Sequence, residues 1–519
     1  MRLGIDFGTT RTVVATVDRG NYPVVSFESA DGAACDWFPS LVAQRGPQRL
    51  YGWEAWARQQ EPGWTTVRSL KRVLDDSGPH TIIRIAGESV PLMCLLTEMA
   101  AALRRALLEQ SSLNVAVADP LQAMLGVPAN ANSNQRFLTA EAFRAAGFDV
   151  LGLLNEPSAS SIEFGHRNRG AGRILVYDLG GGTFDSSLVD LDDLTHFVLA
   201  SEGIPTLGGD DFDHVLAELA LDAAGVSATE RDSLTQAELF QLHEECRLKK
   251  ESLHPNTRRV AVDLDVVRPG WGSVPVVVAD YFEQCRPLMD ETVHLVEDML
   301  AKHDGQPIDT LYVTGGASEL PIVSRVLKET FGRRVKRSGY TRSATAIGLA
   351  IQADAQAGYL LREKLTRHFG VWREGEGGRL VVFDPLFPKN MQLPSPGDAD
   401  IVIRRQYTPA HNIGHLRYLE CSHLDVAAQP KGDIAVWDEI LFPFDPSLRD
   451  ARDLPHSAIA RTSLAGGQRI EERYACDSSG TVRVTIENLS SGYKREYRLG
   501  RWASKEAAIS PGRRKRMKI

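Results

Sequence analysis

The chain has 519 residues, which is longer than one ordinary domain, and 43% apolar with 24% charged residues is typical of a globular protein. The formal net charge of −8 argues against a surface built for general nucleic-acid binding. The six cysteines are scattered without a C-x-x-C pair, which predicts a reducing compartment and no zinc site. A strand is expected at the very N-terminus, and no apolar run approaches the roughly 18 residues of a membrane helix. We therefore expect a cytoplasmic protein without a signal peptide.

The first expected element is a hairpin around a phosphate-sized turn. Residues Arg2–Phe7 form an apolar strand, G-T-T at residues 8–10 forms the turn, and Thr12–Val17 returns as a second strand. Asp6 stands at the lip of the turn. Glycine lets backbone N–H groups approach an anion closely. An ordinary hairpin would give the same pattern, so this turn alone leaves both interpretations open.

The same device returns some 170 residues later. An apolar run over residues 174–177 ends in D-L-G-G-G-T-F-D, Asp178 to Asp185, where three glycines can form a concave nest for an anion and Thr183 adds a hydroxyl. The two carboxylates would repel phosphate, so we expect them to hold Mg²⁺ or water beside it. The recurrence indicates an internal duplication, in which two hairpins clamp one polyphosphate.

Five further motifs follow in chain order. They are R-S-L-K-R-V-L with Lys71, G-V-P-A-N-A-N-S-N-Q-R with Pro128 and Arg136, L-L-N-E-P-S-A-S with Glu156 and Pro157, T-L-G-G-D-D-F-D from Thr206 to Asp213, and V-T-G-G-A-S-E-L-P from Val313 to Pro321. Together with the two turns, these motifs resemble the Hsp70 chaperones of the actin/hexokinase/Hsp70 ATPase superfamily. The resemblance covers residues 1–357.

The resemblance implies an α/β fold of two lobes, each built on a mixed sheet with helices, around a deep nucleotide cleft. An extra α/β subdomain is expected over about residues 207–280 of the second lobe. Its helical stretch, Leu234–Leu253, contains neither Pro nor Gly, as expected of a helix.

The resemblance also implies a catalytic group for ATP hydrolysis. Asp6 and Asp178 would organise Mg²⁺ through bound water, and Lys71 would lie over the γ-phosphate and position the attacking water. Glu156 and Asp185 would complete the network of water and cations. Taken alone, Lys71 could be an exposed helix lysine and Glu156 an acid at a helix N-terminus.

The remaining implied site residues bind the nucleotide or report its state. Pro128 resembles the switch proline of the family, and Arg136 its relay arginine. Thr183 belongs to both the catalytic and the nucleotide-binding set. The full nucleotide-binding set is Gly8, Thr9, Thr10, Gly180, Gly181, Gly182, Thr183, Gly208, Gly209, Lys250, Gly315, Gly316 and Ser318.

The adenosine side departs from the family pattern in its charges. Aligning Lys250 with the family lysine of E-x-x-K-x-x-L-S places Arg247 at its glutamate and His254 at its serine. Glu319 stands where an arginine commonly packs on adenine, and Arg342 where an aspartate is usual. Two interpretations stay open. Either a rearranged set of charge pairs still holds adenine, or nucleotide recognition is weakened or altered.

Residues 358–367 are expected to link the ATPase domain to a second domain. Hsp70 chaperones have a short apolar linker here that ends in an acidic residue and docks on the ATPase domain when ATP is bound. This chain keeps Leu360 and Leu361 and then turns basic. A simple extension of the preceding helix is the alternative.

Residues 368–500 have the pattern of a β-sandwich, with seven short alternating runs separated by Gly, Pro and Asp turns. Pro388–Pro394 and Arg469–Thr485 resemble segments of the Hsp70 substrate-binding domain, which grips an extended peptide by strand-like hydrogen bonds and a side-chain pocket. Val371 is a candidate for the pocket floor, although a core valine is the simpler role. The predicted strands are 379–383, 401–406, 415–420, 434–440, 469–476, 481–487 and 494–499.

Residues 501–519 are expected to form a disordered basic tail, with R-R-K-R-M-K at Arg513–Lys518. So short a segment leaves no room for the helical lid of standard Hsp70 chaperones. We therefore expect a lidless protein that grips its client weakly and releases it fast.

The leading hypothesis is an Hsp70-like chaperone that hydrolyses ATP slowly and couples ATP binding to the binding of unfolded or extended polypeptide. The implied cofactors are ATP or ADP with Mg²⁺. The implied partners are client polypeptides, a J-domain co-chaperone and a nucleotide exchange factor, with no membrane and no nucleic acid. The alternative is a nucleotide-sensing scaffold or adaptor that binds a specific protein and scarcely hydrolyses. A sugar kinase or an actin-like filament protein fits less well, because the Hsp70 spacing continues into a β-domain.

Overall fold

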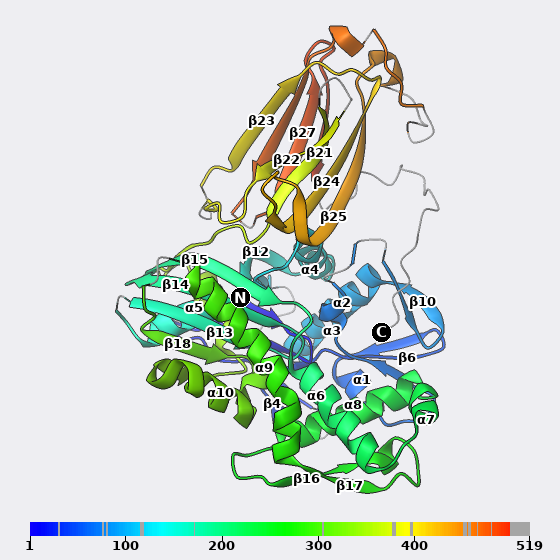
Figure 1. Ribbon diagram of the computed structural model, residues 1–519, viewed down its shortest axis with the longest axis vertical. Helices are drawn as coiled ribbons and strands as arrows, with labels where there is room; N and C mark the ends of the chain where they lie inside the picture. Colours follow the sequence, from blue (N-terminus) through cyan, green and yellow to red (C-terminus); the bar gives the residue numbers. More distant parts are fainter. Residues whose placement is uncertain are drawn as a thin grey trace.

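The protein consists of two α/β lobes with a β-sandwich above them, as Figure 1 shows. The structure, a computed structural model, describes residues 1–498 except 30–31, 75–76, 79–80, 115–118, 171, 304–305, 376–379, 395–397, 450–453, 455–457, 464 and 479. The predicted basic tail, residues 501–519, lies outside this described part. No helix within the described part is long and apolar enough to cross a membrane.

The sheets of the two lobes repeat one strand arrangement. The first has the order β12-β11-β1-β2-β5, and the second has the order β19-β18-β13-β14-β15-β20. In each, the strand that leads into the glycine turn pairs in parallel on one side and antiparallel on the other. The predicted internal duplication is therefore confirmed. The strands are β1 (Arg2–Phe7), β2 (Arg11–Thr16), β5 (Phe38–Pro39), β11 (Gln122–Val127), β12 (Asp149–Asn155), β13 (Gly172–Leu179), β14 (Phe184–Asp192), β15 (Thr195–Ile204), β18 (Thr310–Thr314), β19 (Val335–Arg337) and β20 (Leu360–Arg362).

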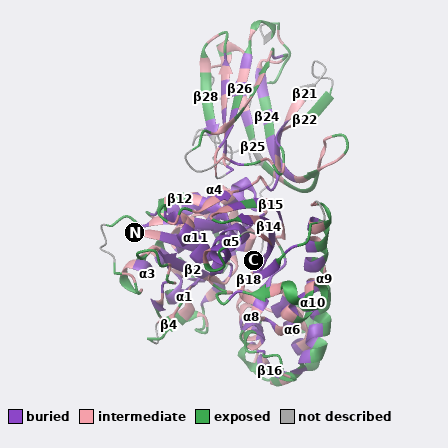
Figure 2. Cartoon of the chain, turned by 90° about the vertical axis from the view of Figure 1, so that its left-hand side faces the viewer, coloured by how far each residue is buried: buried purple, intermediate pink, exposed green. Residues whose placement is uncertain are grey.

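Two helices pack between these sheets, α5 (Glu156–Arg167) and α11 (Ala344–Ala353), and both are almost wholly buried (Figure 2). Their sequences are rich in small residues, which lets the helices approach closely. A Cβ on Gly348 would lie 1.8 Å from the carbonyl oxygen of Ala159. Strands β1 and β13 are buried on both faces, which explains their nearly continuous apolar runs.

Further helices and small sheets cover the outside of each lobe. The predicted helix Leu234–Leu253 is observed as α8 (Gln236–Glu251), and a capping box of Thr235 with Glu238 begins it. The other helices are α1 (Trp53–Arg58), α2 (Leu70–Val73), α3 (Leu92–Glu109), α4 (Ser133–Ala145), α6 (Gly209–Ala223), α7 (Ala228–Asp232), α9 (Val278–Ala301) and α10 (Pro321–Phe331). The small sheets are β3 (Phe27–Glu28) with β4 (Ala34–Cys35), β6 (Val42–Arg45) with β7 (Gln48–Tyr51) and β8 (Thr65–Val67), β9 (Ile82–Ile85) with β10 (Glu88–Pro91), and β16 (Arg259–Asp263) with β17 (Ser273–Val277).

In the part of the chain that the structure describes, the sandwich has two four-stranded sheets, β22-β21-β24-β25 and β23-β26-β27-β28, around an apolar core. It therefore has one strand more than the seven predicted. The missed strand, β21, begins at His368 directly after the linker and lacks a preceding turn signal. Val371 on β21 is fully buried in the core, so the simpler role predicted for it is confirmed. The strands are β21 (His368–Gly375), β22 (Leu380–Phe387), β23 (Ile401–Tyr407), β24 (Ile413–Leu424), β25 (Pro430–Pro443), β26 (Ile470–Cys476), β27 (Val482–Asn488) and β28 (Tyr493–Arg498).

The linker is a strand, so the alternative of a helix extension is wrong. Helix α11 ends at Ala353, and β20 then pairs in parallel with the edge strand β15 of the second lobe. Leu361 is buried there. The prediction that the linker simply turns basic overlooked Glu363. The carboxylate of Glu363 is buried and accepts a 3.4 Å hydrogen bond from the backbone amide of Asn155.

Candidate functional site

The two glycine turns meet at the centre of the cleft. A Cβ on Gly181 would lie 2.6 Å from the hydroxyl oxygen of Thr10, and one on Gly182 would lie 2.7 Å from that of Thr9. Only glycine allows this approach. The sequence prediction that both turns serve one site therefore agrees with their contact. Gly8 and Gly180 lie in the same turns, directly before the threonines and glycines that touch.

Lys71 and Glu156 form a buried ion pair beside the cleft. Lys71 lies on the short helix α2 of the first lobe, and Glu156 is the first residue of α5. Burial lowers the pKa of Lys71, but the carboxylates of Glu156 and Asp6 outweigh burial and raise it overall. The lysine therefore stays charged, and the alternative of an exposed helix lysine is wrong.

Three aspartates crowd around this pair with a surplus of negative charge. Burial, reinforced by Glu156, raises the pKa of Asp6, of Asp178 and of Asp185, while Lys71 opposes the rise. Within the described residues, no group of three or more His, Cys, Asp or Glu is placed to ligate one metal directly. A divalent cation held through water fits this donor set, because it would offset charge that one lysine leaves uncompensated.

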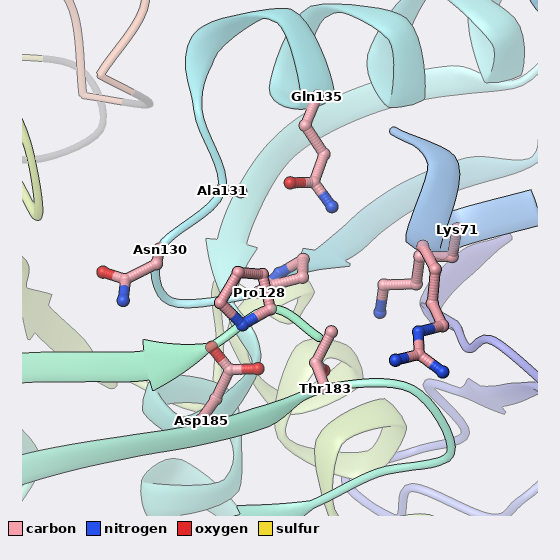
Figure 3. Close-up of a pocket in the computed structure, with 9 residues that line it drawn as sticks. Lys71, Pro128, Asn130, Ala131, Gln135, Thr183 and Asp185 are labelled. Atoms are coloured by element: carbon pink, nitrogen blue, oxygen red, sulfur yellow. The ribbon is translucent and has the colours of Figure 1, made fainter. Parts of the chain in front are cut away.

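A pocket opens between these groups, as Figure 3 shows. Gln135 reaches into it from α4, Lys71 enters from the side, and Thr183 and Asp185 lie below. Sequence reasoning missed several lining residues. Arg72 directly follows Lys71, and Gln135 directly precedes Arg136, so both stood inside quoted motifs. The lining residues are Lys71, Arg72, Pro128, Asn130, Ala131, Gln135, Thr183, Asp185 and Pro205.

The predicted glycines of the second lobe line the cleft beside the turns. Gly208 and Gly209 begin helix α6, and the ammonium group of Lys250 donates to the carbonyl of Gly209 at 2.6 Å. Lys250 also forms an ion pair with Asp213 at 2.7 Å. Lys250 is thus held at the start of α6, beside the second glycine turn.

A second glycine pair, Gly315 and Gly316, lies on the same side of the cleft. Gly315 has a φ of +86°, and a Cβ there would lie 2.4 Å from a carboxylate oxygen of Asp178. Gly316 lies next to the side chain of Arg342. The Ser318 hydroxyl donates to the Gly315 carbonyl at 2.6 Å. These contacts bring the predicted adenosine motif against the phosphate turns.

Each of the three charges that depart from the family pattern, Arg247, Glu319 and Arg342, has a partner of opposite charge. Arg342 donates to the Glu319 carboxylate at 2.6 and 3.0 Å, and Arg247 pairs with Glu244 and with Glu251. Arg11 of the first lobe also contacts Glu251 at 2.6 Å, so this pair joins the two lobes. His254 is exposed and does not join them. A rearranged set of charge pairs is therefore observed, and the binding of adenine beside it stays a prediction.

Pro128 and Arg136 lie at opposite ends of one segment. The backbone amide of Ala129, next to Pro128, donates to a carboxylate oxygen of Asp185 at 2.8 Å. Arg136 contacts the side chain of Asn155 at the end of β12 and faces the sandwich. The segment therefore runs from the cleft to the second domain.

The fold and the cleft define the class of protein, a two-lobed α/β domain of the actin-like type joined to a β-sandwich. Residues 2–365 match the family model described as Hsp70 protein, and the chain belongs to the Hsp70 family. It is 29% identical to a "Chaperone protein HscA homolog" of Chromobacterium violaceum, over 95% of this chain and 77% of the relative. It is 30% identical to "Chaperone protein HscA" of Pectobacterium atrosepticum over the same shares. It is 31% identical to "Chaperone protein DnaK" of Mycoplasmopsis synoviae, over 76% of this chain and 65% of that protein.

Proposed function

We propose that the protein is an ATP-dependent chaperone that couples slow ATP hydrolysis to the binding of extended polypeptide. The observation that carries this proposal is the contact of the two glycine–threonine turns around the buried Lys71–Glu156 pair. Hydrolysis needs charge neutralisation and an oriented water. The cleft offers groups for both, and the relatives named as chaperones share nearly the whole chain.

In this proposal each cleft residue has one task. Backbone amides of the two turns and the hydroxyls of Thr9, Thr10 and Thr183 bind phosphate oxygens. Asp6 and Asp178 would hold Mg²⁺ through water, and their carboxylates would thereby place positive charge beside the phosphates. Lys71, kept charged by Glu156, lies beside the γ-phosphoryl group and orients the water that attacks it.

Client polypeptide would bind on the sandwich. Strand β22 lies at the edge of its sheet and exposes three consecutive apolar residues, Leu380, Val381 and Val382, at 50%, 54% and 39%. An exposed apolar edge strand is a site where an extended chain can add by main-chain hydrogen bonds. Consecutive apolar residues on both faces favour an apolar client segment.

Single-turnover hydrolysis of ATP tests the enzyme part of the proposal. The wild-type protein is expected to form ADP slowly, and Lys71→Ala is expected to abolish it. Lys249→Ala is the matched control, because Lys249 is a partly exposed lysine paired with Glu245 on the outside of α8. Tight nucleotide binding without turnover in the wild type would contradict an ATPase.

The second candidate is a nucleotide-sensing adaptor with little hydrolysis. The Arg11–Glu251 ion pair favours it, because this pair joins the two lobes at 2.6 Å without a nucleotide. Binding of a fluorescent apolar peptide that changes with ATP, in a protein that also turns over, supports the chaperone. Peptide binding that ignores ATP supports the adaptor.

A further inference from the structure

The first turn of α4 is a wall between two cavities. One is the nucleotide cavity, to which Gln135 belongs. The other lies between α4, the linker and the sandwich, and Ser133 and Arg136 line it. Ala131, just before the helix, lines both. A single helical turn therefore faces the nucleotide on one side and the second domain on the other.

Helix geometry explains the division. Successive residues are about 100° apart, so Ser133 and Arg136 share one face, while Gln135 points about 200° away from Ser133. The side chain of Asn132 caps the helix by accepting from the backbone amide of Gln135 at 3.0 Å. The cap ties the position of Gln135 to that of the whole first turn.

The face opposite Gln135 is attached to the sandwich. The Glu420 carboxylate on β24 accepts from the Ser133 hydroxyl at 2.6 Å and from the Ser133 backbone amide at 3.0 Å. Ser133 and Glu420 are both buried. A shift of the first turn of α4 would therefore strain or release two hydrogen bonds between the domains.

We propose that Gln135 binds the terminal phosphoryl group of the nucleotide and so transmits its presence to the β-domain. The inference rests on the proposed function. The amide of Gln135 is a hydrogen-bond donor that is 4% exposed, and Figure 3 shows it directed into the cavity beside Lys71. An amide donates to a phosphoryl oxygen when ATP is bound and loses that acceptor when only ADP remains. The lost hydrogen bond makes the binding free energy of ATP differ from that of ADP, and this difference can shift the docking equilibrium of the β-domain.

The first readout is the ratio of affinities for a non-hydrolysable ATP analogue and for ADP. Gln135→Ala and Gln135→Glu are expected to lower this ratio at least about tenfold, with the ADP affinity unchanged, because a charge-assisted hydrogen bond is lost. Asn134→Ala is the matched control, a buried amide on the same turn that does not line the nucleotide cavity. Its ratio is expected to stay at the wild-type value.

The second readout is hydrogen exchange of residues 360–367, which follows docking of the linker strand. Wild type is expected to protect these amides more with the ATP analogue than with ADP, and the Gln135 variants are expected to lose that difference. Equal losses of affinity for both nucleotides, or a retained exchange difference, overturn the inference. A wild-type protein that binds neither nucleotide overturns the proposed function itself, which is a separate result.

Discussion

Ser133 in the first lobe and Glu420 in the β-domain are 287 residues apart, yet one buried carboxylate accepts both hydrogen bonds that Ser133 donates across the interface. The interface has further polar contacts. Lys389 of the sandwich forms a 2.7 Å ion pair with Glu202 on β15, and Lys364 of the linker donates to the Leu199 carbonyl at 3.3 Å. The β-domain is thus docked on both lobes through its linker end.

Replacing Glu420 is expected to loosen this docking. In Glu420→Ala, the Ser133 amide at the start of α4 loses its acceptor, and a charge-assisted contact disappears. We expect a shift of roughly tenfold or more toward the undocked form, measured by faster hydrogen exchange over residues 360–367 and a larger radius of gyration. Glu439→Gln, on the exposed side of β25, is the control and should leave both unchanged. A compact Glu420→Ala protein with wild-type exchange would show that the contact does not hold the domains together.

The Glu319–Arg342 pair predicts a charge-swap experiment. Arg342→Glu alone places three carboxylates together, because Arg342 also lies 3.7 Å from Glu251. We expect ADP affinity to fall, by roughly tenfold or less since the pair is partly exposed. The double variant Glu319→Arg with Arg342→Glu should recover much of the loss. Calorimetric titration of all four proteins gives the coupling between the two positions. Additive losses would contradict a paired arrangement.

The sequence predicted those parts of the fold that depend on local residue patterns. Alternating strands, glycine turns and the capped helix α8 all depend on residues a few positions apart. The missed features depend on distant contacts. Gln135 lines the cavity because of how α4 packs against the rest of the lobe. Glu363 is buried because the linker strand β20 pairs with β15. The spacing of residues along the chain does not predict either of these contacts.

The catalytic residues also divide into those that local patterns predict and those that depend on distant contacts. Glycine turns and aspartates were predicted because backbone nests and carboxylates have short signatures. Lys71 and Glu156 are 85 residues apart, and only their family motifs placed them in one cleft. Their direct pairing, with the shift it causes in the pKa of Lys71, follows from burial, which the sequence does not display.

His196 predicts a pH dependence of stability. This fully buried histidine on β15 contacts Ser161, and burial lowers its pKa to about 4 from an ordinary 6.5. Between these values the unfolded chain binds a proton that the folded protein excludes, so stability falls as pH decreases from above 6.5 toward 4. We expect the free energy of unfolding to drop by about 2 kcal/mol more between pH 7.5 and 5.0 in wild type than in His196→Asn. Urea unfolding at the two pH values measures this difference.

The control for that measurement is His294→Asn, because His294 lies exposed on α9. This variant should keep the full wild-type drop in stability. If His196→Asn also keeps it, the buried ring is not the group that titrates, and another residue must explain the acid sensitivity.

The buried carboxylate of Glu472 predicts a large effect on the stability of the β-domain. Glu472 is 0% exposed between the two sheets, where it accepts from Arg373 at 2.6 and 3.1 Å and from the hydroxyls of Tyr407 and Tyr474. Glu472→Gln keeps the shape but leaves Arg373 with Asp384 as its remaining carboxylate partner. Breaking a buried ion pair from one side costs about 3 kcal/mol, and we expect a loss of that order in the unfolding free energy of the sandwich.

The neighbouring residue Glu471 provides the control for this experiment. Its side chain is partly exposed and pairs with Gln406 across the same two strands, so Glu471→Gln should change stability by less than about 0.5 kcal/mol. Hydrogen exchange of the amides of β26 and β27 separates unfolding of the sandwich from that of the lobes. If both variants unfold alike, then Asp384 alone satisfies Arg373. In that case the Glu472 network would be a consequence of the fold rather than a source of its stability.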